Sequence, residues 1–161
     1  MSEKKDIEFY TAEGFLSLYN SRFGTSYEIV KKAEAPDIIC RDKKDNQLNL
    51  EITLSEDRNG DIPAMLGRSD SRSYNSLANG KIIASHLQND VCQIMIKRIK
   101  AKLDKHYGPN TALVVRHVSG IPWNWDNVID SIKNSLNLRQ NPYDKGIWIM
   151  NNSKTEIFRI A

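Results

Sequence analysis

One segment of the chain alternates polar and apolar residues as a half-buried strand does. In residues 47–54, leucine or isoleucine stands at every second position from 48 to 54, and Asn49, Glu51 and Thr53 lie between them. Because successive side chains of a strand point to opposite faces, we expect the apolar set to enter a core and the polar set to line the other face. The pattern therefore predicts a strand that carries Glu51 on its polar face.

Periodicity elsewhere predicts the remaining elements of an α/β domain. Apolar residues at helical spacing predict helices over 9–23, 82–107 and 126–138. Short apolar runs bounded by turn residues predict strands. The predicted strands cover 27–33, 37–41, 47–54, 111–116, 145–150 and 155–160. With 161 residues, 40% of them hydrophobic, we expect a single domain over residues 1–161.

Residues 55–80 break these patterns because Ser, Asn, Asp, Arg and Gly dominate them. A loop longer than about 12–15 residues in a compact domain is more often functional or disordered than incidental. Two interpretations stay open, a flap that contacts a ligand and a disordered insertion. Three arginines of this loop, Arg58, Arg68 and Arg72, are candidates for contacts with a phosphate backbone.

Composition and charge narrow the class of protein. The chain has 23 Lys and Arg against 20 Asp and Glu, a balance compatible with a nucleic-acid partner that does not require one. No stretch approaches the roughly 20 apolar residues of a membrane span, and the charged beginning is not followed by a signal-peptide core. We therefore expect a cytoplasmic protein without membrane association. Cys40 and Cys92 fall in apolar patterns and are expected to be buried, reduced thiols.

Two carboxylates can meet on neighbouring predicted strands. Asp37 follows Pro36 at the start of the strand 37–41, and a polar turn joins this strand to the one that carries Glu51. Carboxylate oxygens hold hard divalent cations such as Mg2+. A metal ion that bridges carboxylates and a phosphate can acidify water and neutralise the charge that develops when a phosphodiester is cut.

Pro36-Asp37 followed by Glu51-Ile52-Thr53, in a layout of helix, three strands, helix and strand over residues 9–116, resembles the restriction-endonuclease-like superfamily of PD-(D/E)XK nucleases. The resemblance implies a restriction-endonuclease-like α/β fold with a mixed central sheet flanked by helices. It implies Mg2+ or Mn2+ held by Asp37, Glu51 and the backbone carbonyl of Ile52, and hydrolysis of phosphodiester bonds of nucleic acid, with DNA as the expected partner. Many members dimerise, so a homodimer or a protein partner is compatible with it.

One position departs from the superfamily pattern, because Thr53 stands where the motif has its lysine. Some members carry that lysine on the following helix. On a helical wheel of residues 82–107, Lys102 falls at the edge of the apolar arc and most other lysines of the helix fall outside it. Lys102 is therefore the candidate for the migrated lysine, with Thr53 as a hydrogen-bonding neighbour. The alternative is a lysine that reaches water from the edge of the core.

Two further residues are candidates by position. Glu13 lies at the margin of the apolar face of the first helix, where superfamily members often place a glutamate near the metal; a solvated surface glutamate is the alternative. Gln88 enters the apolar arc of 82–107 if that helix is unbroken and could contact the substrate. If the missing lysine is not replaced, the resemblance implies a catalytically inactive protein that serves as a nucleic-acid-binding, regulatory or immunity module.

Overall fold

The computed structural model describes residues 3–56, 81–118 and 123–161, without the side chains of residues 56 and 81–90. The described chain combines helices with strands that form a mixed sheet, which confirms the α/β class. The elements are α1 (Glu3–Phe23), β1 (Glu28–Lys32), β2 (Ile38–Arg41), β3 (Gln47–Glu56), α3 (Lys81–Leu103), β4 (Thr111–Val118), α4 (Trp125–Ser135), β5 (Ile147–Met150) and β6 (Ile157–Arg159).

The six described strands form one mixed sheet in the order β1-β2-β3-β4-β5-β6. Antiparallel pairing joins β1, β2 and β3, whereas β3, β4 and β5 run parallel to one another, and β6 is antiparallel to β5. Parallel neighbours need a crossover connection, and α3 lies in the chain between β3 and β4.

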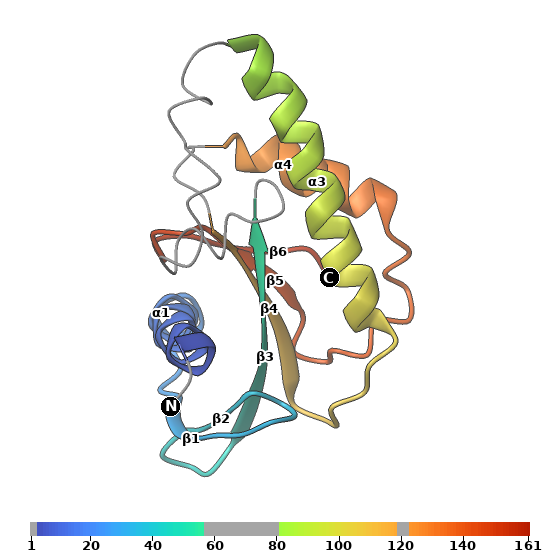
Figure 1. Ribbon diagram of the computed structural model, residues 1–161. Coiled ribbons are helices and arrows are strands. Elements are labelled where there is room, and N and C mark those ends of the chain that lie inside the picture. Colours follow the sequence, from blue (N-terminus) through green and yellow to red (C-terminus); the bar gives the residue numbers. More distant parts are fainter. Residues whose placement is uncertain (1–2, 57–80, 119–122) are drawn as a thin grey trace.

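Helices cover both faces of the sheet, with α1 on one face and α3 and α4 on the other (Figure 1). The alternation along β4 shows the two layers directly. Ala112 and Val114 join the core beneath α1, and Leu113 and Val115 join the core beneath α3 and α4. The sheet therefore separates two apolar cores.

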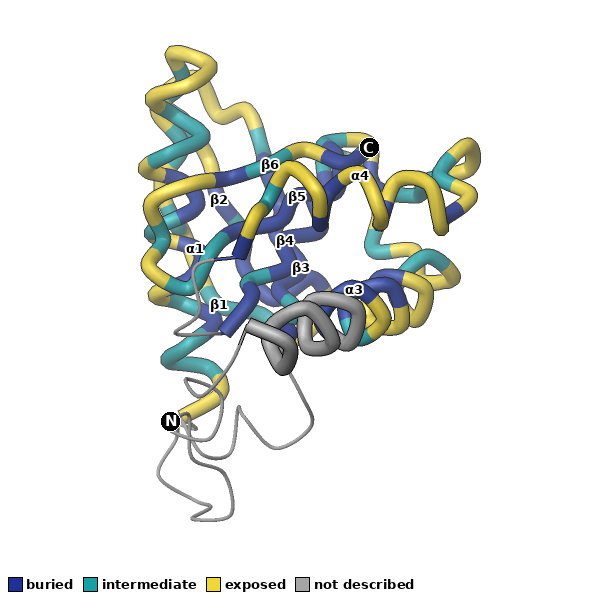
Figure 2. The backbone as a smooth tube through the Cα atoms, turned by 90° about the horizontal axis from the view of Figure 1, so that it is seen from above, coloured by how far each residue is buried: buried dark blue, intermediate teal, exposed yellow. Residues whose placement is uncertain are grey.

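The predicted alternation along β3 is confirmed for the face that packs against α1, where Leu48, Leu50 and Ile52 are buried. The opposite face is not open to solvent, because Asn49 and Glu51 are only 6% and 3% exposed. Figure 2 shows the central strands as the most buried part of the chain. A carboxylate at this depth needs a cationic or hydrogen-bonding partner.

Three helix boundaries differ from the sequence prediction by three residues or more, one of them the end of α4 at Ser135 rather than at residue 138. The first helix begins at Glu3 rather than at residue 9, and α3 ends at Leu103 rather than at residue 107. The earlier start adds a turn and a half that contains Lys5 and Glu8, which lie 3.6 Å apart at Nζ and Oε2; Lys5 also lies 3.9 Å from Asp37 Oδ1. Cys40 and Cys92 are buried as predicted, and burial raises the pKa of Cys40 to about 12.

Candidate functional site

Asp37 lies directly before β2, just beyond the end of the pairing between β2 and β3. The last residue pair between β2 and β3 joins Ile38 to Leu50. Beyond it, the backbone N–H of Ile52 donates a hydrogen bond to Asp37 Oδ2 at 2.8 Å instead of pairing with a strand. Because the N–H and C=O of one strand residue point to the same edge, the carbonyl of Ile52 is directed to the same edge as Asp37.

Glu51 approaches Asp37 from the next strand and is nearly inaccessible to solvent. Its Oε2 accepts a hydrogen bond from Lys102 Nζ at 2.7 Å. Its Oε1 is buried, and no hydrogen-bond donor reaches it from the described residues. The negative charge of Glu51 also raises the pKa of Asp37. The two carboxylates, Asp37 and Glu51, can therefore bind a cation.

The electrostatics of Asp37 reflect this crowding. Burial raises its pKa, the charges of Glu51 and Glu8 raise it further, and the hydrogen bond from Ile52 lowers it, leaving a pKa of about 7. An ordinary aspartate titrates near 4. The site therefore has an excess of negative charge that a bound cation would neutralise.

Lys102 reaches the site from the last turn of α3, the element on which the sequence predicted it. The hydroxyl of Tyr143 donates to the backbone carbonyl of Lys102 at 2.8 Å, and the hydroxyl of Tyr107 lies 3.5 Å from its Nζ. Burial alone would lower the pKa of Lys102, but the hydrogen bond and charge of Glu51 raise it above its ordinary value. Lys102 is therefore a fixed cation at neutral pH.

The helix α1 contributes a buried glutamate, and it is Glu8 rather than the predicted Glu13. Glu8 is 3% exposed and raises the pKa of Asp37 through its charge. Its Oε2 lies 3.6 Å from the Nζ of Lys5, which is in turn 3.9 Å from Asp37 Oδ1. Glu8 and Lys5 thus approach Asp37 from the face of the sheet opposite to Lys102.

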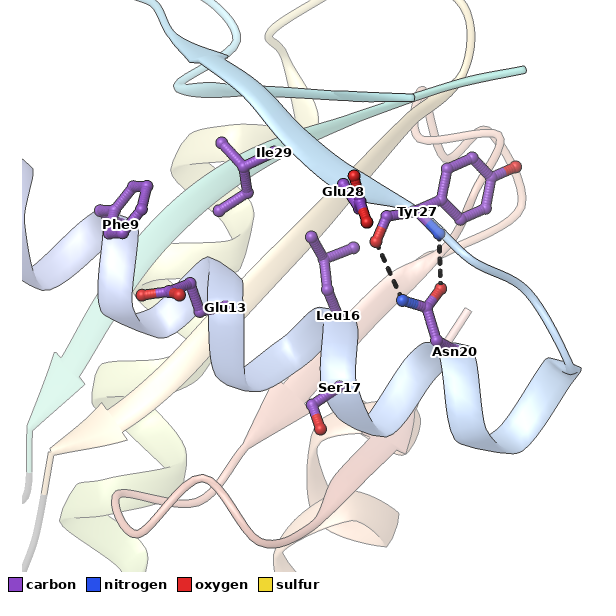
Figure 3. A pocket seen from close by; sticks show the side chains of 8 residues that line it. All are labelled: Phe9, Glu13, Leu16, Ser17, Asn20, Tyr27, Glu28 and Ile29. Atoms are coloured by element: carbon purple, nitrogen blue, oxygen red, sulfur yellow. Dashed lines mark hydrogen bonds between the residues drawn. The ribbon is translucent and has the colours of Figure 1, made fainter. Parts of the chain in front are cut away.

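Glu13 is exposed and lines a separate surface pocket of about 390 Å3 between α1 and the start of β1 (Figure 3). Five residues separate it from Glu8, which places it roughly 140° further around the helix. Of the two interpretations of Glu13, its exposure agrees with the solvated surface glutamate. Asn20 closes the far end of that pocket by bonding both backbone groups of Tyr27.

The sequence carries a signal for Glu8 that the late predicted start of the helix concealed. Glu8 stands four residues before Ala12 and seven before Phe15, and both of these are fully buried on the face that packs against the sheet. This spacing repeats one helical face. A helix begun at residue 3 would have placed a glutamate in the buried stripe.

The residues present fit a divalent ion that keeps several water ligands. Among residues 3–56, 81–118 and 123–161, no group of three or more His, Cys, Asp and Glu side chains is placed to hold a metal. Mg2+ is commonly bound through only one or two carboxylates with water. Asp37, Glu51 and the carbonyl of Ile52 make up such a set, and the buried Glu51 Oε1 is an acceptor that lacks a donor.

Among the other candidate residues, the structure describes the side chain of Thr53 but not those of the loop arginines or Gln88. Thr53 is half-buried and follows Glu51 on the same face of β3. Arg58, Arg68 and Arg72 lie outside the described residues, as does most of the loop 55–80. Gln88 lies in α3, but its side chain is outside the described part.

Comparisons with known proteins give no relative: no protein-family model, curated protein or solved structure matches this chain. No helix among the described residues is long and apolar enough to cross a membrane. Inferences about function therefore depend on the fold and the chemistry of the site.

Proposed function

We propose that this protein is a metal-dependent nuclease with a restriction-endonuclease-like fold, which hydrolyses phosphodiester bonds of nucleic acid. The observation that carries the proposal is the convergence of Asp37, Glu51 and Lys102. Asp37 lies directly before β2, Glu51 in the middle of β3 and Lys102 in the last turn of α3. Two carboxylates and a lysine are the groups that the superfamily motif combines.

The arrangement of elements supports the fold assignment. The helix α1, the antiparallel strands β1 to β3, the helix α3 and the strand β4 follow one another in the order that the resemblance implies. The central sheet is mixed, and helices cover both of its faces. Asp37 lies just beyond the last residue pair of β2 and β3 and accepts the N–H of Ile52, the residue that follows Glu51.

The residues would divide the chemistry as follows. Asp37, Glu51 and the carbonyl of Ile52 would hold Mg2+ or Mn2+, which when bound supplies a Lewis acid and lowers the pKa of water. Lys102 keeps its charge and is oriented by Glu51, so it can stabilise a phosphate oxygen as negative charge develops. Thr53 brings a hydroxyl that can donate one hydrogen bond but no positive charge.

Incubation of the purified protein with plasmid, single-stranded DNA and RNA in Mg2+ or Mn2+ tests the proposal. We expect cleavage of at least one substrate that stops when EDTA removes the metal. Absence of cleavage on all three substrates with either metal would reject the nuclease.

The alternative is a catalytically inactive protein of the same fold that binds nucleic acid or another protein. Two observations favour it: Thr53 replaces the motif lysine, and the described residues contain no three-ligand metal group. Binding of DNA that weakens steeply with salt, without metal dependence or cleavage, would identify the nucleic-acid-binding form. Thermal stabilisation by Mn2+ that Asp37→Asn abolishes would argue against it.

A further inference from the structure

The ammonium of Lys5 lies among oxygen atoms of four residues at the candidate site. Its Nζ donates a hydrogen bond to the carbonyl of Ala33 at 2.8 Å. The carboxylate oxygens Glu8 Oε2, Glu34 Oε2 and Asp37 Oδ1 lie 3.6, 3.6 and 3.9 Å from it. Carbonyl and carboxylate oxygens are also the ligands that a hard divalent cation selects.

Lys5 neutralises carboxylates that water reaches poorly. The side chains of Glu8 and Asp37 are 3% and 11% exposed, and that of Lys5 is 23% exposed. Removing such carboxylates from water is unfavourable unless a positive charge accompanies them. A metal ion on Asp37 would supply that charge, and it would repel an ammonium that stayed within a few ångströms.

We propose that Lys5 is the resident counter-cation of this site, and that a divalent metal ion displaces its ammonium from Asp37 and Glu8 when it binds. The inference rests on the proposed function only in taking Asp37 as a metal ligand. The first turns of α1 would then set how tightly the metal binds. Without metal, the hydrogen bond from Lys5 to Ala33 ties this turn to the β1–β2 connection.

Titration with Mn2+ alone, followed by the electron paramagnetic resonance signal of free Mn2+, tests this inference without substrate. The variant Lys5→Met matches the unbranched lysine side chain as far as its ε position and removes the charged Nζ. Lys5→Gln removes the charge and retains a donor for Ala33, which guards against loss of folding. We expect the Mn2+ Kd to fall about tenfold in both variants because a competing charge is gone.

Lys4 provides the matched control. It is the neighbouring lysine, its side chain is 78% exposed, and its Nζ lies 3.8 Å from Glu8 Oε1. In Lys4→Met we expect the Mn2+ Kd to stay within about twofold, since exposed charges are screened. When Asp37→Asn is combined with Lys5→Gln, the expected decrease in the Mn2+ Kd caused by Lys5→Gln should disappear.

An unchanged or higher Mn2+ Kd in both Lys5 variants would overturn the inference, and so would the absence of Mn2+ binding in every form of the protein. Tighter Mn2+ binding by the Lys5 variants of a protein that cuts no nucleic acid would reject the nuclease and support the role of Lys5. Circular dichroism without metal verifies that each variant is folded.

Discussion

Lys102 Nζ lies 2.7 Å from Glu51 Oε2, although the two residues are 51 positions apart in the chain. The contact joins the last turn of α3 to the middle of β3 and places a positive charge beside the acid pair. Thr53, two residues after Glu51, cannot supply that charge. Lys102 therefore supplies beside Glu51 a positive charge that Thr53 does not.

Replacement of Lys102 should separate catalysis from metal binding. We expect Lys102→Met to lower the cleavage rate by about 10²–10³, the usual loss when one group that stabilises developing charge is removed. The affinity for Mn2+ should not fall, because the variant removes a cation from the neighbourhood of the metal ligands. Single-turnover cleavage and Mn2+ titration measure the two quantities.

Lys100 is the control for this prediction, because it lies in the same helix and its side chain is exposed. We expect Lys100→Met to leave the cleavage rate within about twofold, as for other exposed charges. Equal losses in Lys100→Met and Lys102→Met would show a general effect of positive charge on substrate binding and would count against a specific role for Lys102.

The raised pKa of Asp37 predicts a dependence of stability on pH. Its folded pKa of about 7 lies above the unfolded value near 4, so the native state binds the proton more tightly. The associated stability is present at low pH and is lost as the pH rises towards and through 7. Without metal, we expect Asp37→Asn to gain on the order of 2 kcal/mol in unfolding free energy relative to wild type between pH 5 and pH 8.

Urea unfolding at both pH values measures this difference. Asp130, an exposed aspartate of α4, provides the control, and Asp130→Asn should show no comparable change between pH 5 and pH 8. A difference between wild type and Asp37→Asn that is the same at both pH values would contradict the raised pKa.

The protonation of Asp37 should also control the affinity of the site for a metal ion. A proton and a metal ion compete for the carboxylate of Asp37, so the Mn2+ affinity should rise as the pH increases and level off above a pKa of about 7. Below pH 7 we expect a change of about tenfold per pH unit for one proton released. Calorimetric titration between pH 5.5 and pH 8 measures it, and a constant affinity over that range would rule out Asp37 as a ligand.

The two glutamates of α1 should behave differently. Glu8→Gln removes a buried negative charge beside Asp37 and should weaken Mn2+ binding by about threefold or more. Glu13→Gln changes an exposed residue in another pocket, and its Mn2+ Kd should match that of wild type. The reverse pattern in Mn2+ titrations would restore Glu13 as the acidic neighbour of the site.

Much of the fold follows from local patterns in the sequence. The alternation at Leu48, Leu50 and Ile52 predicts β3 and its packing face, because one strand carries both the period and the buried side chains. Lys102 could be selected because the wheel of a long helix fixes its angle relative to the apolar arc. Both inferences need only one regular element.

The remaining features depend on contacts between distant segments. The predicted start of the first helix at residue 9 left Glu8 outside the helix, so its place on the buried face could not be predicted. Helix ends are poorly marked when no capping residue is evident. The position of Lys5 beside Ala33 and Asp37 depends on how α1 crosses the end of β1. The contact of Tyr143 with the end of α3 joins residues 41 positions apart and leaves no periodic trace.

Single-turnover nicking of supercoiled plasmid in Mn2+ by wild type, Glu51→Gln and Glu156→Gln tests the nuclease assignment most directly. Glu51 is the more deeply buried carboxylate of the pair, and Glu156 is an exposed glutamate of the β5–β6 connection. We expect nicking by wild type and Glu156→Gln at similar rates, and a loss of about 10² or more in Glu51→Gln. Equal nicking by all three proteins, or none by wild type, would contradict the assignment of Asp37 and Glu51 as the centre of a metal-dependent nuclease.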